Sequence, residues 1–412
     1  MLGARALSFL HRSVRSVILD HSSDLRLTCH PSLAPYLVRE VEALGLPVEH
    51  MTRTGVVTRG GWPDVWRLCL ELRTANSVLR PLKTFACDSP KTLYHNVRSI
   101  PWEEIIPEEH GYLTVESFVD HPSVDNSMFP NLRVKDAICD HLIKMRGVRP
   151  DSGPDRRGVV VHLHWNGRRA TISLNAAGWK LADRGYRKSA HRAPLREPLA
   201  AAIVMESGWD GRRPLLVPMC GSGTLAIEAA LIALDRAPGL LRLGFGFERT
   251  AGLDEEAWKS MRSAVRARAR KSLDAPIVAS DIDAEAVEAA RRNALTAGVE
   301  HLIEFHVGDF AETPLPQMPA GGGEGDDDDA GPAGVLLVNP EYGERLGDER
   351  ELEPVYERLG TWFRESLPGW RCHLLSGNPR LTRHLGLRSS RRVPFMNATL
   401  ECRLLEYEIR PR

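Results

Sequence analysis

The sequence lacks a long apolar run, clustered cysteines and a net charge. No stretch of its 412 residues approaches the roughly 18 consecutive apolar residues that indicate a transmembrane helix, so no membrane partner is expected. The seven cysteines are scattered and form no C-x-x-C pair, which argues against a disulfide framework or a zinc site and favours a reducing compartment. The formal net charge is zero, which argues against a strongly cationic chain but leaves local basic patches open.

Motifs for metal binding are also missing. The fifteen histidines include no H-E-x-x-H, and four consecutive aspartates at 326–329 lack the spacing of a calcium loop, so no bound metal is expected. Residues 1–22 predict a flexible N-terminal extension. Its first 19 residues contain three arginines and no acid, a composition that also fits a mitochondrial transit peptide. We favour a bacterial N-terminus and a cytoplasmic location, with a mitochondrial location as the alternative.

The chain divides by pattern into three units. Residues 23–86 predict the order strand–helix–strand–strand–helix–strand, which is ferredoxin-like. Residues 87–178 predict a second α+β unit. From residue 179 to 412, apolar strands alternate with helices, which indicates an α/β domain with a mostly parallel sheet. Within that domain, a segment at about 314–334 is rich in glycine and aspartate, cannot bury a core and is expected to be a disordered loop.

Asn339-Pro340-Glu341-Tyr342 directly follows the apolar run Val335–Val338, which predicts a buried parallel strand. An α/β sheet usually places its ligand at this end of a strand. The Asn339 side-chain oxygen and the Pro340 carbonyl can accept the two hydrogens of an exocyclic amine on a planar base, and Tyr342 can stack on the ring. The motif therefore suits methyl transfer to such an amine, with Asn339, Pro340 and Tyr342 as the catalytic residues.

A glycine-rich loop upstream supplies a candidate cofactor site. It follows the short apolar run Leu215–Val217, and its predicted cofactor-binding residues are Pro218, Cys220, Gly221, Gly223 and Thr224. Glycines let the backbone turn tightly, and the N–H groups of the helix that begins at Thr224 can face a carboxylate. The loop also fits the dinucleotide pattern G-x-G-x-x-A, so a nicotinamide cofactor is a rival. That pattern expects an acid about 20 residues further on, at the end of the next strand, and Asp281 is much too far away for this unless a helical insertion intervenes.

Two acids at later strand ends extend the cofactor site. Asp281 ends the strand predicted at 277–280, where its carboxylate can accept both ribose hydroxyls of an adenosyl group. Asp309 follows the strand predicted at 302–307 and can accept the adenine amine, with Phe310 beside the ring. Along the chain, the glycine loop is followed by two acids and then by the Asn-Pro-x-Tyr motif. This order is a more specific signal for the site than any one of its members.

These residues carry a family resemblance. Residues 218–224 together with 339–345 resemble the THUMP-domain class I methyltransferases, and within them the bacterial enzymes that methylate guanine N2 in large-subunit ribosomal RNA. Residues 133–140, 184–187, 193–197 and 400–402 are similar to further segments of that family. The resemblance implies a Rossmann-like class I methyltransferase domain with a mostly parallel seven-stranded sheet, preceded by an α+β ferredoxin-like and THUMP RNA-binding region. It also implies S-adenosyl-L-methionine as cofactor and ribosomal RNA as partner.

Basic residues near the joint between the halves are the candidate RNA contacts. Arg184, Tyr186, Arg187 and Lys188 interleave positive charge with an aromatic ring, which suits contact to RNA backbone and bases. A solvated linker that packs under the cofactor site explains them equally well. Arg133 and Lys135 on the helix predicted at 131–145 are further candidates, although a plain surface helix is at least as good an explanation.

Two departures from the family pattern keep rival functions open. The family usually has Asp where this chain has Val217, and a second Pro where it has Glu341. The first alternative is methylation of guanine N2 in transfer RNA or of another nucleobase amine. The second is an RNA-binding ribosome-assembly factor whose catalysis has decayed. The sequence determines neither the nucleotide position nor the oligomeric state.

Overall fold

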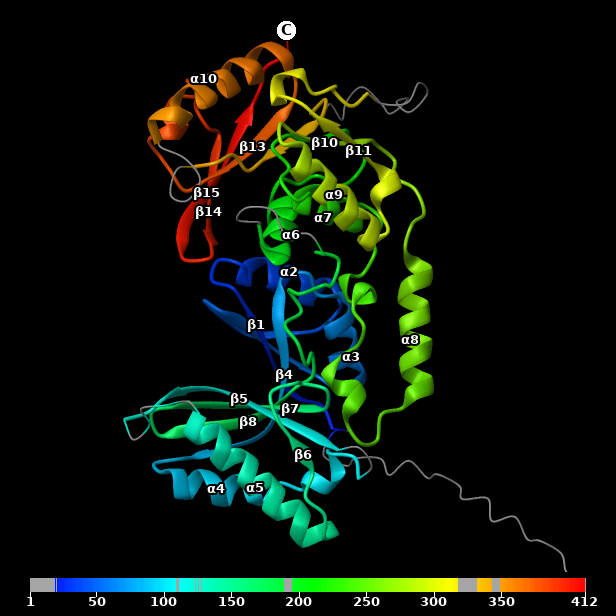
Figure 1. Cartoon of the computed structure of the whole chain (residues 1–412), viewed down its shortest axis with the longest axis vertical. Coiled ribbons are helices and arrows are strands. Elements are labelled where there is room, and N and C mark those ends of the chain that lie inside the picture. Colours follow the sequence, from blue (N-terminus) through cyan, green and yellow to red (C-terminus); the bar gives the residue numbers. More distant parts are fainter. Residues whose placement is uncertain are drawn as a thin grey trace, which may run out of the picture.

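The computed structural model (Figure 1) describes residues 19, 21–108, 111–122, 124, 126, 128–188, 195–317, 332–342 and 349–411. Most of the predicted N-terminal extension and most of the predicted disordered loop lie outside these residues. Leu19 is described and is buried against the core of the first unit. Among the described residues, no helix is both long and apolar enough to cross a membrane.

The N-terminal unit has the predicted ferredoxin-like order. Its elements are β1 (Ser23–Cys29), α2 (Ala34–Ala43), β2 (Val48–Thr52), β3 (Gly55–Gly60), α3 (Trp62–Glu71) and β4 (Ala75–Ala86). Both helices are amphipathic: α2 buries Tyr36, Leu37 and Val41 at helical spacing. Helix α3 begins after Gly61, whose N–H donates to the Asp64 carboxylate at 2.8 Å, a helix-capping bond.

The second unit shares a sheet with the first. It contains α4 (Pro90–Arg98), η1 (Trp102–Glu104), β5 (Tyr112–Asp120), α5 (Met128–Arg146), β6 (Asp151–Ser152), β7 (Val159–Asn166) and β8 (Arg169–Asn175). The twelve-residue strand β4 pairs with β1 on one side and β8 on the other, so eight strands run in the order β2-β3-β1-β4-β8-β7-β5-β6. The register slips between Pro81 and Lys83, where proline cannot donate to the ladder. Separate units were predicted, and the shared sheet and helix α4 were not.

The C-terminal half carries the second sheet, in the order β11-β10-β9-β12-β13-β15-β14. Its strands and helices are α6 (Glu197–Glu206), β9 (Leu215–Val217), α7 (Thr224–Ala233), η2 (Pro238–Leu241), η3 (Gly246–Arg249), α8 (Glu255–Arg268), β10 (Ile277–Asp281), α9 (Ala284–Ala297), η4 (Glu300–Leu302), β11 (Ile303–Val307), η5 (Phe310–Glu312), β12 (Val335–Val338), α10 (Glu349–Ser366), β13 (Arg371–Ser376), η6 (Leu381–Arg383), β14 (Arg391–Asn397) and β15 (Leu400–Glu408). The first five strands are parallel, and β15 runs antiparallel to both of its neighbours, β13 and β14, which confirms the predicted mostly parallel seven-stranded sheet.

Figure 1 shows the catalytic half at one end of the molecule, the ferredoxin-like unit in the middle and the second unit at the other end. Helix α8 stands apart beside the middle unit. Aromatic packing fixes it there, because Trp258 contacts Trp66 of α3 and Phe247 edge-on, with ring centroids 6.3 and 4.9 Å apart. The three units therefore share extensive contacts.

Candidate active site

The predicted site residues follow neighbouring strands. Strand β9, which leads into the glycine loop, lies between β10, which ends at Asp281, and β12, which leads to Asn339. Because these strands are parallel, their carboxyl ends meet at one edge of the sheet. The structure therefore brings the glycine loop, Asp281 and the Asn-Pro-x-Tyr loop to the same edge.

The glycine loop depends on one glycine in particular. Gly223 caps α7 with φ +82°, and a Cβ added there would lie 2.8 Å from the Ala290 Cβ, so no larger residue fits. Gly221 also has positive φ, at +52°, but a Cβ there would meet nothing within 4 Å. Gly223 thus allows close packing of helices, whereas Gly221 leaves open space beside the loop.

The Asp281 side chain hydrogen-bonds to the glycine loop. Its Oδ2 accepts the Gly221 N–H at 2.9 Å, and its Oδ1 accepts the Asp283 N–H at 3.0 Å. The Cys220 N–H donates to the Ser280 carbonyl at 2.8 Å and links the loop to the end of β10. Each carboxylate oxygen can accept more than one hydrogen bond, so Asp281 retains capacity for the predicted ribose hydroxyls.

Cys220 fits the loop as a small residue and not as a nucleophile. Burial, reinforced by the charge of Asp281, raises the pKa of its thiol well above the ordinary value. A thiol of raised pKa stays protonated at neutral pH and is unreactive. Pro218 and Val217, which precede it, are buried in the sheet.

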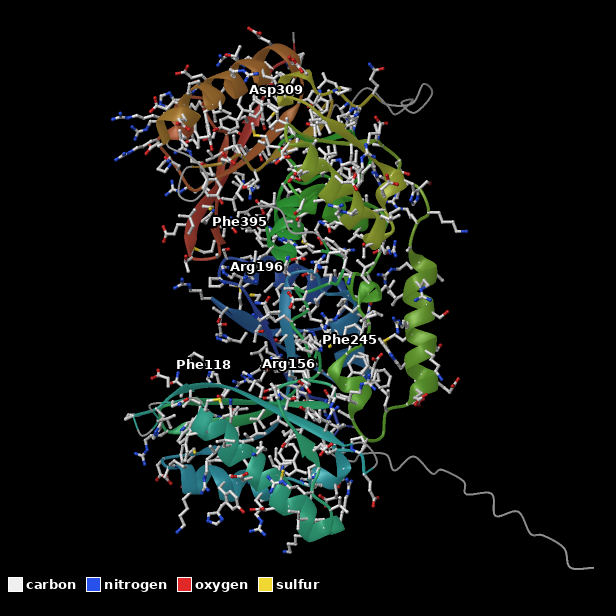
Figure 2. The ribbon with its side chains drawn as sticks, viewed as in Figure 1. Phe118, Arg156, Arg196, Phe245, Asp309 and Phe395 are labelled. Carbon is white, nitrogen blue, oxygen red and sulfur yellow. The ribbon has the colours of Figure 1, made fainter. Side chains whose placement is uncertain are left out.

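Asp309 and Phe310 contact α10, a partnership that the sequence did not indicate. Arg358 donates to Asp309 Oδ1 at 2.8 Å, and its guanidinium lies 5.1 Å from the centre of the Phe310 ring. Phe310 is only 5% exposed and packs edge-on against Trp362 at 5.4 Å. Figure 2 labels Asp309 at the end of the molecule beside α10. Adenine contacts for both residues stay predictions.

Asn339 presents an unusual buried atom at the centre of the site. Its Oδ1 is buried and has no hydrogen-bond partner within the described residues. A buried acceptor without a partner costs about 1–3 kcal/mol, so such atoms are rare outside functional sites. The adjoining Pro340 is also buried. The arrangement leaves an acceptor available for a donor that the protein itself does not supply.

The rest of the Asn-Pro-x-Tyr loop is held by three residues that sequence reasoning did not assign to the site. Asn397 at the end of β14 donates to the Tyr342 hydroxyl at 2.7 Å, and Asn378 donates to the Tyr342 carbonyl at 3.4 Å. The Tyr356 hydroxyl of α10 donates to the carbonyl of Glu341 at 3.0 Å. In the sequence, Asn378 follows the strand that is now β13 and Asn397 ends β14, and a turn role explains an asparagine at a strand end equally well.

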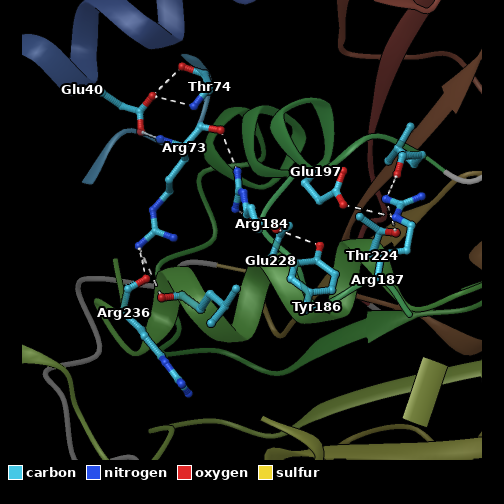
Figure 3. A network of polar contacts seen from close by, with 12 residues as sticks. Glu40, Arg73, Thr74, Arg184, Tyr186, Arg187, Glu197, Thr224, Glu228 and Arg236 are labelled. Carbon is cyan, nitrogen blue, oxygen red and sulfur yellow. Dashed lines mark hydrogen bonds and ion pairs between the residues drawn. The ribbon is translucent and has the colours of Figure 1, made fainter. Parts of the chain in front are cut away.

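Two of the predicted RNA contacts are wrong. Arg184 and Tyr186 are each only 1% exposed, so neither can reach RNA. Arg184 pairs with the buried carboxylate of Glu228 in α7 and donates to the Arg73 carbonyl at 2.6 Å, and the Tyr186 hydroxyl donates to Glu228 at 2.9 Å (Figure 3). Basic and aromatic residues at the joint were mistaken for a surface, because their buried acidic partner, Glu228, lies 42 to 44 residues further along the chain.

The remaining candidates have partners but stay accessible in part. Arg187 donates to Glu197 Oε1 at 3.2 Å and to the Thr224 hydroxyl at 3.3 Å, which ties the joint to the first residue of α7 (Figure 3). Lys188 is exposed. RNA contact by Arg187 and Lys188 stays a prediction.

On α5, the Arg133 guanidinium lies 5.2 Å from the centre of the Tyr94 ring, and Lys135 is 3.7 Å from Asp136. These contacts are ordinary for a helix surface, and RNA contact by the two residues stays a prediction. Among the described residues, no group of three or more His, Cys, Asp or Glu side chains could hold a metal ion.

Comparison with known proteins follows from this geometry. The chain matches three family models: the RlmL ferredoxin-like domain over residues 24–79, the THUMP domain over 87–175 and the RMKL-like methyltransferase domain over 184–406. These spans are consistent with the predicted order of units. The predicted boundaries themselves stay predictions.

Curated relatives carry the name ribosomal RNA large subunit methyltransferase K/L. The protein from Syntrophotalea carbinolica is 37% identical over 388 residues, which cover 93% of this chain and 53% of the relative. The protein from Aeromonas salmonicida is 36% identical over 387 residues, covering 93% and 54%. This chain thus spans about half the length of the curated relatives it matches.

Solved structures with the same fold cover almost the whole chain. SMU.472, a putative methyltransferase complexed with SAH, gives a TM-score of 0.82 at 25% identity and covers 95% of this chain and 99% of its own. A possible methylase from Clostridium difficile 630 gives 0.81 at 28% identity, with the same coverage. Since the methyltransferase model alone matches more than half of the chain, the chain belongs to the family of RMKL-like methyltransferase domains.

Proposed function

We propose that the protein transfers a methyl group from S-adenosyl-L-methionine to the exocyclic N2 amine of a guanine in large-subunit ribosomal RNA. The observation that carries this proposal is the buried Asn339 Oδ1, which has no partner among the described residues and follows the strand next to the glycine loop. A guanine amine would supply the missing donor.

The residues at the sheet edge fit the cofactor. The N–H groups at the start of α7 would face the carboxylate of its methionine part, and Asp281 would accept its ribose hydroxyls. When bound, S-adenosyl-L-methionine would supply an electrophilic methyl group and leave as S-adenosylhomocysteine, and the methylated nitrogen would lose one proton to solvent. The SAH in the solved SMU.472 structure, which shares the fold along 95% of this chain, supports this assignment.

The protein's own contribution is orientation of the amine. The guanine N2 lone pair is delocalised into the ring, and acceptors for both N–H groups would turn the nitrogen toward the methyl donor. Asn339 Oδ1 and the Pro340 carbonyl would serve as these acceptors. Tyr342 would hold the ring, itself fixed by Asn397 and Asn378. Positioning of this kind lowers the barrier without a general base of unusual pKa.

The choice of guanine in ribosomal RNA rests on the relatives and not on the loop. Any planar amine satisfies the Asn-Pro-x-Tyr geometry, and a solved structure from Listeria monocytogenes with a TM-score of 0.79 is titled a predicted N6-adenine-specific DNA methylase. The curated relatives are named for ribosomal RNA, and the THUMP match supports an RNA substrate. Guanine in ribosomal RNA therefore remains the better-supported substrate.

The test combines product identity with Asn339→Ala. Wild-type protein, S-adenosyl-L-methionine and unmodified large-subunit ribosomal RNA should yield N2-methylguanosine after digestion to nucleosides. Loss of one acceptor at the amine should lower turnover about 100-fold or more, while calorimetry shows cofactor affinity within two-fold of wild type. Glu256→Ala, at an exposed position on α8 remote from the site, is the control and should behave as wild type.

Three outcomes would contradict the proposal in different ways. If the product were N6-methyladenosine, the substrate base would be adenine and not guanine. Near-normal turnover of Asn339→Ala would remove the orientation role. Failure of the wild type to bind the cofactor would favour the decayed assembly factor, in keeping with Val217 in place of the family's usual acid.

A further inference from the structure

One face of the eight-stranded sheet is open where β4, β8, β7 and β5 lie side by side. The strand register places Thr84, Thr171, His164 and Phe118 in one row across these strands. Alternate side chains such as Leu163 point to the other face and are buried. Figure 1 shows α4 and α5 on that other side of the sheet. The row Thr84–Phe118, here called the open row, therefore lies on the face opposite α4 and α5. Its Phe118 end is open to solvent, whereas Thr171 within it is 3% exposed.

The open row ends in an exposed aromatic pair. Phe118 is 54% exposed, and its ring stacks on the His164 ring with centroids 5.3 Å apart and an angle of 15° between the ring planes. Beside them, the Thr84 and Thr171 hydroxyls share a hydrogen bond of 3.0 Å. Parallel rings standing on a polar sheet do little for core packing, since one side of Phe118 faces solvent. Such rings are the usual platform for unpaired nucleobases.

Exposed charges of both signs surround the open row, and the arginines among them can meet a phosphate backbone. Arg26 on β1 projects from the same face, is exposed and has no ion pair within the described residues. Arg169 is exposed one row from Phe118, and the exposed acids on this face are Asp24 and Asp120. The carboxylate of Glu116, one row away, is already bound by Arg156 at 2.6 Å and by Asn175 at 2.8 Å. Its negative charge is therefore compensated, and a phosphate backbone can approach.

His164 remains suited to stacking at neutral pH. Burial, together with the charges of His162 and Arg26, lowers the pKa of His164. The neutral ring then presents a flat surface without the hydration shell of an imidazolium.

The open face is turned toward the catalytic half. Figure 2 shows Phe118 and Arg156 on the side of the second unit that faces the hairpin of β14 and β15, where Phe395 is labelled. That hairpin carries Asn397, the partner of Tyr342. A strand of RNA on the open row would thus lie on the same side of the molecule as the hairpin that supports the site.

We propose that Phe118 and His164, with Arg26, bind unpaired nucleotides of the RNA substrate by stacking and by backbone contact. The inference rests on the proposed function for the identity of the RNA. It moves the main RNA contact from α5, where Arg133 and Lys135 were predicted, to the opposite face of the same sheet. The surface fits an apolar protein partner less well, because the residues around the exposed Phe118 ring are polar.

The experiment measures affinity of the full chain for a fluorescent unpaired RNA of about 12 nucleotides, within the usual site size for single strands. Stacking on one ring predicts that Phe118→Ala and Phe118→Leu bind the RNA about five-fold or more weakly. Phe118→Tyr keeps a ring and should stay within two-fold of wild type. Phe129→Ala is the matched control, since Phe129 lies on α5 and is 48% exposed.

The outcomes separate this inference from the proposed function. Equal RNA affinity of wild type and Phe118→Ala would overturn the inference, and so would a loss confined to Phe129→Ala, which would return the contact to α5. Equal losses in the leucine and tyrosine variants would also overturn it, because a ring would then be irrelevant. Weaker RNA binding by Phe118→Ala alongside a wild type that makes no N2-methylguanosine would sink only the proposed function.

Discussion

Asn339 and Tyr342 are prepared for their roles in opposite ways. The Asn339 oxygen is left without a partner among the described residues, whereas the Tyr342 hydroxyl and carbonyl are both bound by asparagines from the C-terminal strands. The amide acceptor is thus kept free while the ring is fixed. At the scale of single residues, the account therefore assigns the asparagine at 397 a positioning role.

Replacing Asn397 by alanine should weaken turnover without changing cofactor binding. One lost hydrogen bond is worth about 1 kcal/mol, so kcat should fall about five-fold. Tyr342→Phe removes the same hydrogen bond by deleting its acceptor, so the kcat of this variant should fall by a similar factor. The double variant should be no worse than either single variant, because both delete one interaction. Additive losses would show that Asn397 acts on something other than Tyr342.

The residues of the site differ in how far sequence could identify them. Asn339, Gly223 and Asp281 each follow an apolar strand, and parallel strands converge at one edge, so their proximity could be predicted. The roles of Asn378 and Asn397 depend on which turn meets which loop across the sheet, which no local pattern encodes. Arg184 looked like a surface base because burial depends on a distant partner, Glu228.

At the scale of elements, β13 contains a titratable residue in an apolar setting. His373 is 1% exposed between β12 and β15, and its Nε2 has no hydrogen-bond partner within the described residues. Burial, with the charges of Arg371 and Arg391, lowers its pKa to about 4. The ring is therefore neutral in the folded protein at pH 5, when an exposed histidine is charged.

This difference predicts a loss of stability in mild acid. Below pH 6.5 the unfolded chain binds a proton at His373 that the folded chain does not, so stability falls as pH drops from 6.5 toward 4. Between pH 7 and pH 5, His373 should cost about 2 kcal/mol in the free energy of unfolding. Urea unfolding of His373→Leu should lack this part of the decline. His301→Leu, at an exposed position, should keep it; a steep decline in both variants would exclude His373 as the source.

At the scale of the whole molecule, a buried polar network joins the N-terminal half to the catalytic half. Figure 3 shows Arg73, whose guanidinium donates to the Arg236 carbonyl at 3.0 Å and whose own carbonyl accepts from Arg184. Arg184 in turn pairs with Glu228 of α7, the helix that follows the glycine loop. The units that were predicted separately are thus coupled through Arg184 and Glu228, which are almost fully buried, and through the half-buried Arg73. Local patterns could place the units but not this junction.

Arg184→Met should destabilise the protein strongly, because it leaves the Glu228 charge buried without its cation. Breaking a buried pair in this way costs about 3–5 kcal/mol. The double variant Arg184→Met/Glu228→Leu removes both charges and should recover at least half of that loss in urea unfolding. A double variant less stable than Arg184→Met would show that the network stabilises by more than charge pairing.

The most direct test of the central claim is mass mapping of large-subunit ribosomal RNA from a strain that lacks this gene. The account predicts that one N2-methylguanosine disappears on deletion, returns with the wild-type gene and stays absent with Asn339→Ala. Ribosomal RNA with an unchanged set of methylated guanines in the deletion strain would contradict the account.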